Sequence, residues 1–451
     1  MGARDDMAVR GGRFLVVGLG KTGEAVSRFL ARGGARVTAT DLRGPEEIAC
    51  AEELRAMGVT VAAGGHREAD FVSADTVILS PGVSPDIAPV RAARAAGAEV
   101  TGEAEFSFRL SGLPVVAVTG SNGKTTTTGL IAAILRRCGR RPFVGGNFGD
   151  PFISAVENER DYDLALLEMS SFQLKTTSAF SPFVAVVLNV SPNHLDIHPD
   201  YADYVASKRK MFANQTPEQW AVANGRDREA AAMPEGSKAR KVIFDRSVSG
   251  PRPGFVTARG RTVFFNGGSY DLSGSKLEGA HNLENCMAAV AVAAILGCDP
   301  ALTALAVREF SPPPHRMEFV GEAGGARVYD DSKATNPAAT ARALESLAAP
   351  VVLISGGRDK KTGYSGLRPL VENKVSSLVL FGESRAAMRA ELGGLAKTFI
   401  ANSLEEAVRR ALADAEPGGS VLFSPACSSF DMFSSFEERG REFKRIVHAL
   451  K

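Results

Sequence analysis

The sequence has few of the features that mark export, membrane insertion or nucleic-acid binding. Its five cysteines are scattered and odd in number, and no CxxC pair occurs, which argues against a disulfide framework and against a zinc site. A net charge of +2 leaves no basic excess for nucleic acid, and no apolar run approaches membrane-spanning length. Residues 1–6 are charged and carry no apolar segment, so we expect a reduced, cytoplasmic protein that is not exported.

The chain is long enough for several domains. At 451 residues it exceeds the size at which one hydrophobic core keeps growing, and its 44% hydrophobic and 23% charged residues are typical of a soluble protein. A Ser-Gly-Leu-Pro break at Ser111–Pro114 and three consecutive prolines within Ser311–Pro314 are the clearest interruptions. We therefore predict three domains, at residues 1–111, 112–313 and 314–451.

Short apolar segments alternate with helical segments along most of the chain. This rhythm predicts α/β domains with mainly parallel sheets: a Rossmann-like N-terminal domain, a central ATPase-like domain and a Rossmann-like C-terminal domain. Residues 251–275 lack helical periodicity and predict short antiparallel strands, whereas residues 282–296 predict a helix. Strands are expected at residues 14–17, 37–40, 77–79, 164–167, 184–188, 327–329, 351–354, 378–381 and 421–423, and helices of the first domain at residues 24–32, 46–57 and 87–96.

The most specific motif is VVAVTGSNGKTTTT at residues 115–128, an apolar strand followed by a glycine-bearing turn and a helix. The glycines allow backbone N–H groups to close on phosphate oxygens, Lys124 supplies a cation, and the Thr125 hydroxyl can bind magnesium. Val118 stands where the Walker pattern has glycine, so the loop is a variant. An ordinary glycine turn is the alternative, but these features in this order predict a nucleoside triphosphate site.

A second glycine loop, GLGKTG at residues 18–23, follows the first expected strand and opens a helix, and Asp41 ends the next strand. This is the layout of a dinucleotide-binding fingerprint. The same geometry suits any diphosphate at a helix N-terminus, and a tight strand-to-helix turn without a ligand is equally compatible. The loop alone therefore leaves NAD, another diphosphate and a purely structural turn open.

Polar residues follow the strands of the expected central domain. Glu168 ends one strand, where magnesium needs an oxygen ligand, and His194 follows the next strand toward the same edge. A surface glutamate and an ordinary polar histidine are the alternatives. Asn147 lies in a glycine-rich turn that either contacts a ligand or is only structural, and Lys208 by itself reads as a solvated helix lysine.

Four further residues surround the expected boundary of the third domain. Arg316 stands at the hinge, where a guanidinium can reach a γ-phosphate. Asn282 precedes an expected helix and could be its cap. A helix-cap role would also explain Asp331, but it would not explain Lys333.

Taken together, the motifs resemble those of the D-glutamate-adding Mur ligases over nearly the whole chain. They are SNGKT at 121–125, EMSSFQ at 168–173, NHLD at 193–196, PHRME at 314–318, DSKATN at 331–336 and SPACSS at 424–429. The resemblance implies an ATP-dependent amide-bond ligase of peptidoglycan precursor synthesis. It would add D-glutamate to UDP-N-acetylmuramoyl-L-alanine through an acyl phosphate and a tetrahedral intermediate. It also implies a monomer that uses ATP and two Mg²⁺ ions, with a carbamate on Lys208.

The resemblance assigns roles residue by residue. The catalytic set is Lys124, Glu168, His194, Lys208, Arg316 and Lys333. The ATP-binding set is Gly120, Ser121, Asn122, Gly123, Lys124, Thr125, Thr126, Asn282, Asn285, Arg316 and Asp331. The metal ligands are Thr125, Glu168, His194 and Lys208. The substrate-binding set is Thr22, Asp41, Arg43 and Ser80 for UDP, with Asn147, and Thr335, Lys360, Ser429, Phe430 and Phe436 for the amino acid.

Three alternatives stay open. Another amino-acid ligase, either a folylpolyglutamate synthetase or a Mur ligase adding a different residue, differs in amino-acid selectivity. A NAD-dependent oxidoreductase fused to an ATPase would transfer hydride, and an ATP-driven switch would hydrolyse ATP without any amino acid. Two departures from the pattern are Asn193, where some relatives carry Asp, and Lys21, a cation in the first glycine loop without an assigned role.

Overall fold

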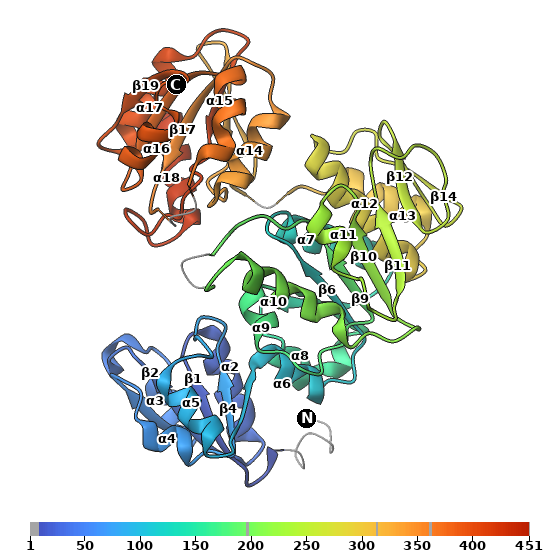
Figure 1. Ribbon diagram of the computed structural model, residues 1–451, viewed down its shortest axis with the longest axis vertical. Helices are drawn as coiled ribbons and strands as arrows, with labels where there is room; N and C mark the ends of the chain where they lie inside the picture. Colours follow the sequence, from blue (N-terminus) through green and yellow to red (C-terminus); the bar gives the residue numbers. More distant parts are fainter. Residues whose placement is uncertain (1–8, 195–197, 313, 360–362, 451) are drawn as a thin grey trace.

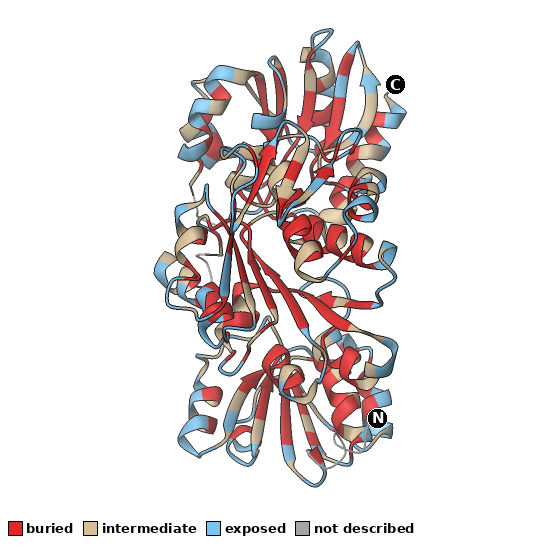
Figure 2. Ribbon diagram, turned by 90° about the vertical axis from the view of Figure 1, so that its right-hand side faces the viewer, coloured by how far each residue is buried: buried red, intermediate tan, exposed pale blue. Residues whose placement is uncertain are grey.

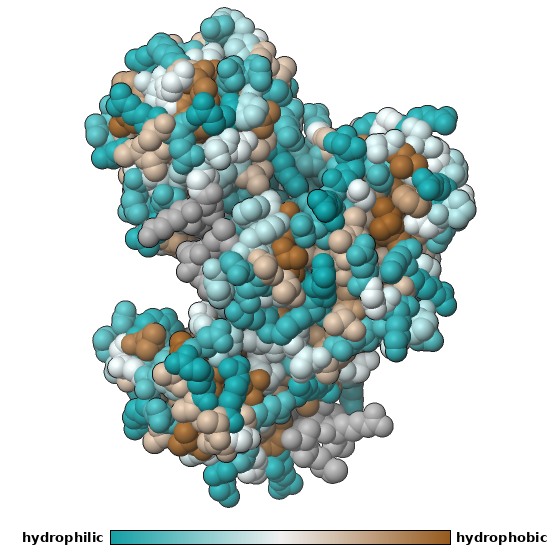
Figure 3. Space-filling view, in the orientation of Figure 1, coloured by the Kyte–Doolittle hydropathy of each residue, from teal (hydrophilic) through white to brown (hydrophobic). Residues whose placement is uncertain are grey.

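The structure, a computed structural model, describes residues 9–194, 198–312, 314–359 and 363–450. Three α/β units follow one another along the chain, each built on its own sheet. The N-terminal unit (blue) and the C-terminal unit (orange to red) stand on the same side of the central unit (Figure 1). A deep hollow separates these two outer units on that side (Figure 3). Among the described residues, no helix has the length and apolar character required to cross a membrane.

The N-terminal unit is a parallel sheet of strand order β3-β2-β1-β4-β5. Its strands are β1 (Arg13–Val17), β2 (Arg36–Asp41), β3 (Thr60–Ala63), β4 (Thr76–Leu79) and β5 (Glu99–Gly102), and its helices include α2 (Lys21–Arg32), α3 (Ala51–Ala56), α4 (Glu68–Val72) and α5 (Ala88–Ala95). The helix predicted at residues 46–57 is wrong as one element, because it breaks into η1 (Pro45–Glu47) and α3. The edge strand β3 was not predicted, since its side chains are exposed or only half-buried.

The central sheet has nine strands in the order β14-β13-β12-β11-β10-β9-β6-β8-β7. The parallel strands are β6 (Val115–Thr119), β7 (Pro142–Gly146), β8 (Leu164–Glu168), β9 (Val184–Val187), β10 (Trp220–Asn224) and β11 (Arg240–Phe244). The antiparallel strands predicted within residues 251–275 are confirmed as β12 (Phe255–Arg259), β13 (Thr262–Phe265) and β14 (Gly268–Asp271). All five residues of β6 are buried, as expected for a parallel strand covered on both faces.

Two layers of helices sandwich this sheet. One hydrophobic core lies beneath α7 (Lys124–Arg137), α12 (Ala280–Ile295) and α13 (Pro300–Glu309). A second core on the opposite face includes residues of α8 (Ile153–Glu157), α9 (Ser171–Lys175), α10 (Tyr201–Ala213) and α11 (Arg228–Ala232). The buried colouring runs through the strands of all three sheets (Figure 2). Because these parallel strands are held between packed helices, their carboxyl ends lie along one edge of the sheet. The polar residues that follow the strands therefore lie at that edge as well.

The C-terminal sheet has the order β15-β16-β20-β17-β18-β19 and is parallel except for the β15–β16 hairpin. Its strands are β15 (Glu318–Ala323), β16 (Ala326–Asp330), β17 (Val351–Gly356), β18 (Val375–Phe381), β19 (Lys397–Ile400) and β20 (Ser420–Phe423). Helices α14 (Pro337–Ser346), α15 (Arg368–Lys374) and α16 (Arg385–Leu392) cover one face, and α17 (Leu404–Asp414) and α18 (Phe436–Ala449) cover the other. Neither β15 nor β19 was predicted, and both have mostly half-buried or exposed side chains.

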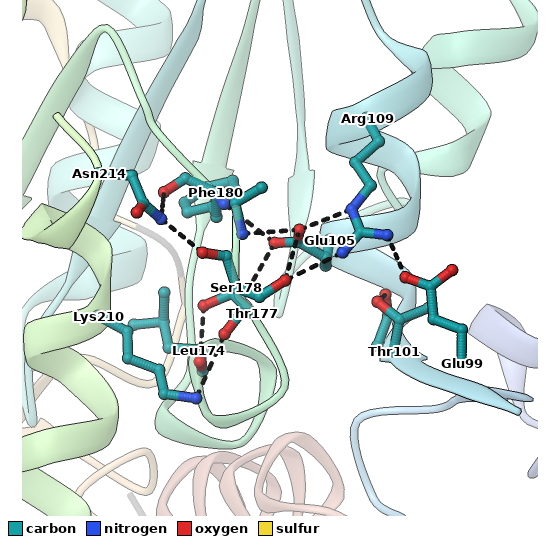
Figure 4. Close-up of polar contacts among 12 residues, drawn as sticks. Glu99, Thr101, Glu105, Arg109, Leu174, Thr177, Ser178, Phe180, Lys210 and Asn214 are labelled. Atoms are coloured by element: carbon teal, nitrogen blue, oxygen red, sulfur yellow. Dashed lines mark hydrogen bonds and ion pairs between the residues drawn. The ribbon is translucent and has the colours of Figure 1, made fainter. Parts of the chain in front are cut away.

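Helix α6 (Glu103–Leu110) joins the N-terminal and central units through a buried carboxylate. Glu105 has no exposed surface and accepts hydrogen bonds from the backbone N–H groups of residues 178–180, at 2.8–3.0 Å, and from Arg109. Lys210 and Asn214 donate to carbonyls of the same turn (Figure 4). The turn that ends α9 is therefore fixed from both sides.

Candidate functional site

The phosphate-loop motif forms a tight turn between β6 and α7. Gly123 has φ = 84° and a Cβ there would lie 2.5 Å from Asn285 Oδ1, so only glycine fits. The backbone of Asn122 exchanges hydrogen bonds with the Asn189 side chain, at 2.9 Å in each direction. Sequence reasoning missed Asn189, which follows β9 and braces the loop.

Two lysine amines converge on one carbonyl of this loop. Lys124 Nζ donates to Gly120 O at 2.8 Å, and Lys208 Nζ lies 3.3 Å from the same oxygen. Lys208 is 1% exposed and its amine lies 4.7 Å from the centre of the Tyr204 ring, so the prediction of a solvated lysine is wrong. Burial lowers the pKa of both amines, and for Lys208 the nearby Lys124 lowers it further.

A cavity of about 230 Å³ gathers most of the predicted residues at the junction of the central and C-terminal units. From the central unit it receives the loop and the ends of β7, β8 and β9, and from the C-terminal side Arg316 and Lys333. Its lining is Ser121, Asn122, Gly123, Lys124, Thr125, Asn147, Glu168, Ser170, Ser171, Phe172, Asn193, His194, Tyr204, Lys208, Arg316, Lys333, Thr335 and Asn336. Four of these side chains are cationic, which suits a polyanionic ligand.

Glu168 is the acidic residue of this cavity. It is 2% exposed, which excludes the alternative of a surface glutamate. Its Oε1 accepts from Asn147 Nδ2 at 2.8 Å, whereas the buried Oε2 has no hydrogen-bond partner among the described residues. A buried, unsatisfied carboxylate oxygen is costly unless something else binds it. Glu168 Oε2, the Thr125 hydroxyl and His194 therefore form a donor set that fits Mg²⁺.

Arg316 and Lys333 face the cavity from the C-terminal side. Arg316 forms no hydrogen bond or ion pair with the described part of the chain, and burial lowers its pKa. The Lys333 amine lies 3.8 Å from the centre of the Phe436 ring, and burial together with Arg316 lowers its pKa to about 8. Both groups are therefore desolvated cations that form no ion pair with a carboxylate of the described chain, as expected for residues that bind phosphate oxygens.

The segment that carries Arg316 is held by a buried pair that sequence reasoning missed. His315 Nδ1 lies 2.6 Å from Asp330 Oδ2, and its backbone N–H donates to Glu318 Oε2 at 2.8 Å. His315 has φ = 62°, and Gly440 packs against its ring. These three side chains are close enough to hold a metal, but Glu318 also pairs with Lys444 and His315 with Asp330. These contacts therefore hold the backbone at His315, next to Arg316.

A narrower cavity of about 90 Å³ adjoins the first and contains Asn282, Asn285 and Asp331. The helix-cap alternative does not hold for Asn282, because Gly279 is the cap of α12 and Asn282 contacts Glu278 O and Asn285. It does not hold for Asp331 either, since Asn336 caps α14. Asp331 instead accepts hydrogen bonds from Ser424 and the Met317 backbone, and burial raises its pKa to about 7.

The residues predicted for the UDP group form a separate cluster in the N-terminal unit. Asp41 accepts from the Leu19 backbone N–H at 2.6 Å and pairs with Arg43, which lowers the pKa of Asp41. Ser80 Oγ donates to Gly18 O at 2.7 Å, and Thr22 is half-buried on α2. The first glycine loop is therefore braced by two of its predicted ligand-binding residues.

Lys21 connects this loop to the central unit. Its amine donates to Gly149 O at 2.9 Å and lies 2.8 Å from Asp150 Oδ1. Gly149 and Asp150 end the glycine-rich turn that carries Asn147, the partner of Glu168. Lys21 therefore links the N-terminal unit to the central unit, a contact that the sequence alone did not indicate.

The residues predicted for the amino acid are only partly brought together. Thr335 lines the main cavity and Phe436 lies beneath Lys333. Ser429 is buried and Phe430 is 61% exposed, and neither lines that cavity. Lys360 lies outside the described residues.

Three domain families match the chain in order. Residues 12–102 match the Mur ligase MurD-like N-terminal domain, residues 118–293 the Mur ligase middle domain, and residues 315–427 the Mur ligase glutamate ligase domain. The chain belongs to the Mur ligase family, which confirms the resemblance seen in the motifs.

Two curated relatives indicate which member of the Mur ligase family this chain is similar to. A protein of Geobacter metallireducens named UDP-N-acetylmuramoylalanine–D-glutamate ligase is 44% identical over 98% of this chain and 99% of its own length. A protein of Pelotomaculum thermopropionicum with the same name is 44% identical over 97% of this chain and 98% of its own.

Solved structures share the fold. A pseudomurein peptide ligase type C from Methanothermus fervidus aligns with a TM-score of 0.61 at 18% identity, covering 97% of this chain and 100% of its own. A MurF ligase from Thermotoga maritima, solved in complex with ADP, aligns with a TM-score of 0.60 at 16% identity, covering 100% of both chains.

Proposed function

We propose that this chain is an ATP-dependent ligase that joins D-glutamate to UDP-N-acetylmuramoyl-L-alanine in peptidoglycan precursor synthesis. Relatives with that substrate pair in their name match almost its entire length. The observation that carries the proposal is the 230 Å³ cavity, which combines the phosphate loop, four cations and the unpartnered Glu168 oxygen between two units. Such a site suits transfer of a phosphoryl group more than simple nucleotide storage.

The chemistry follows from the poor electrophilicity of a carboxylate. The alanyl carboxylate of the UDP-sugar attacks the γ-phosphorus of ATP, which yields an acyl phosphate and ADP. The D-glutamate amine then adds to the activated carbonyl carbon, loses its proton, and phosphate leaves the tetrahedral intermediate. Lys124, Arg316 and Lys333 neutralise the charge on the phosphate oxygens and hold the reactants in place.

Thr125, Glu168 and His194 are the residues that would hold Mg²⁺, which would neutralise phosphate charge as a Lewis acid. Lys208 becomes a further ligand if its amine forms a carbamate with carbon dioxide. Its burial supports this, because a desolvated amine is more often neutral and therefore nucleophilic. A carbamate would also replace one of two adjacent cations by an anion.

Each of the three units is assigned to a different substrate. We assign residues 1–111 to the UDP group, with Thr22, Asp41, Arg43 and Ser80 as its contacts. Residues 112–313 bind ATP, with Asn282, Asn285 and Asp331 near the nucleoside. Residues 314–451 bind D-glutamate through Thr335, Lys360, Ser429, Phe430 and Phe436. The protein acts as a cytoplasmic monomer.

The test is phosphate release from ATP and Mg²⁺ with UDP-N-acetylmuramoyl-L-alanine and, in turn, D-glutamate, L-glutamate, L-lysine or D-alanine. Release with a new amide of the expected mass only with D-glutamate supports the proposal. Phosphate release with another amino acid would show that the chain is a Mur ligase with a different amino-acid specificity. Phosphate release that needs neither substrate would show only an ATPase. Lys124→Met is the control that should remove all of these activities.

A further inference from the structure

A buried serine and a buried histidine are linked in series with a half-buried carboxylate beside the site. His198 Nε2 lies 2.9 Å from Ser171 Oγ, and His198 Nδ1 lies 2.6 Å from Asp203 Oδ2. Ser171 and His198 are each 2% exposed. The imidazole stacks on Phe172 at 5.2 Å with an interplanar angle of 12°. Sequence reasoning assigned no role to any of these residues.

The carboxylate sets the direction of both hydrogen bonds. Burial raises the pKa of Asp203, but hydrogen bonds from His198 and Lys175 outweigh it and leave this pKa lowered. An ionised carboxylate only accepts, so it selects the imidazole tautomer with the proton on Nδ1. In that tautomer Nε2 accepts, so the Ser171 hydroxyl donates to it. The remaining lone pairs of Ser171 Oγ can only accept.

Ser171 lies where a ligand from the N-terminal unit would enter the site. It lines the 230 Å³ cavity together with Phe172. On its other side Phe172 lines a small cavity of about 50 Å³ with His198, and the opposite wall of that cavity is the Pro81–Pro85 segment of the N-terminal unit. A substrate held by that unit therefore passes Phe172 and Ser171 before it reaches Glu168.

We propose that Ser171 Oγ accepts a hydrogen bond from the alanyl amide N–H of the UDP-sugar substrate. Asp203 and His198 are positioning residues that keep the hydroxyl oriented as an acceptor. The alanyl amide nitrogen is one carbon away from the reacting carboxylate, so anchoring its N–H restricts the direction in which that carboxylate points. This inference rests on the proposed function, because it needs the UDP-sugar as the substrate.

The test replaces the alanyl residue of the substrate by L-lactate, which exchanges the amide N–H for an ester oxygen of nearly the same shape. The wild-type enzyme should prefer the amide over the ester in kcat/KM by about tenfold, the value of one hydrogen bond. In Ser171→Ala this preference should fall to about one. In His198→Phe, which keeps the ring against Phe172 but frees the hydroxyl to rotate, it should fall to roughly threefold. The ratio is measured within one preparation, so it does not depend on how much protein folds.

Ser191→Ala is the matched control, since it deletes a buried hydroxyl nearby that has no hydrogen-bond partner in the described chain, and it should keep the tenfold preference. An unchanged preference in Ser171→Ala would overturn the inference, as would a covalent acyl-serine found by mass spectrometry. If the wild type ligates neither substrate, the proposed function fails first. If it ligates both equally, only the role of Ser171 fails.

Discussion

Two buried glutamates, Glu105 and Glu168, show how differently the same side chain is used in this fold. Glu105 accepts three backbone N–H groups and the Arg109 guanidinium. Burial raises its pKa, but the backbone hydrogen bonds and Arg109 together outweigh burial and leave this pKa lowered. Glu168 has one partner, Asn147, and a second oxygen without any in the described chain. A fully satisfied carboxylate holds structure together, whereas an unsatisfied one among cations indicates a binding site.

The strongest way to test this contrast is Glu168→Gln. The change keeps the bond to Asn147 possible but removes the charge that faces Lys124 and Lys208. We expect kcat to fall about a thousandfold, with the melting temperature unchanged or higher, because the charge on a buried, unsatisfied carboxylate has been removed. Ligation rate and thermal melting on the same sample measure this, and a melting temperature that falls with the activity would contradict a binding role.

Glu105→Gln should show the opposite pattern. One amide NH₂ would face backbone N–H donors at a fully buried position, so the free energy of unfolding should drop by about 2–4 kcal/mol. Activity per folded molecule should stay near that of the wild type. Urea unfolding followed by circular dichroism gives the first quantity, and Arg109→Met, which leaves the three backbone bonds intact, should cost less.

Asp331 adds a carboxylate whose pKa moves in the other direction. Its pKa is raised to about 7, so the folded protein keeps a proton that the unfolded chain loses near pH 4. Stability from this group is therefore lost as pH rises from about 4 to 7. For Glu105, whose pKa is lowered, stability is lost instead as pH falls below about 4.

Asp331→Asn should raise the melting temperature of the nucleotide-free protein at pH 8 by roughly 3 °C and by a clearly smaller amount at pH 5. It should also weaken ATP binding. A gain of the same size at both pH values would mean that the carboxylate is not the cause. Melting curves at the two pH values, with and without ATP, separate these outcomes.

The smallest effect is expected for Lys21→Ala. Both members of the Lys21–Asp150 pair are more than half exposed, so the pair contributes little to stability. Its removal should change the KM for the UDP-sugar by less than about threefold. Asp150→Ala serves as the matched variant, and a tenfold effect of either would show that the contact controls how the N-terminal unit is placed.

The central part of the site could be predicted from the sequence because it depends on local order. The phosphate loop and Glu168 each follow a buried apolar strand, and the carboxyl ends of parallel strands meet at one edge. Asn189, Tyr204 and His198 could not be found in this way. Each acts through a partner distant in sequence, such as Tyr204 with Ser121. Hydrophobic periodicity also did not predict the edge strands β3 and β19. Their side chains are exposed or only half-buried, so their sequences contain no long continuous apolar run.

Among the residues that the structure describes, one hydrogen bond joins the two halves of the nucleotide site. Asn336 Nδ2, at the cap of α14, donates to Asn122 Oδ1 of the phosphate loop at 3.3 Å. A single neutral bond of this kind contributes only about 1 kcal/mol, so thermal motion breaks it often. We expect nucleotide entry and product release to require that this hydrogen bond break. A compound that bridged the two asparagines would inhibit by holding the site shut, without resembling any substrate.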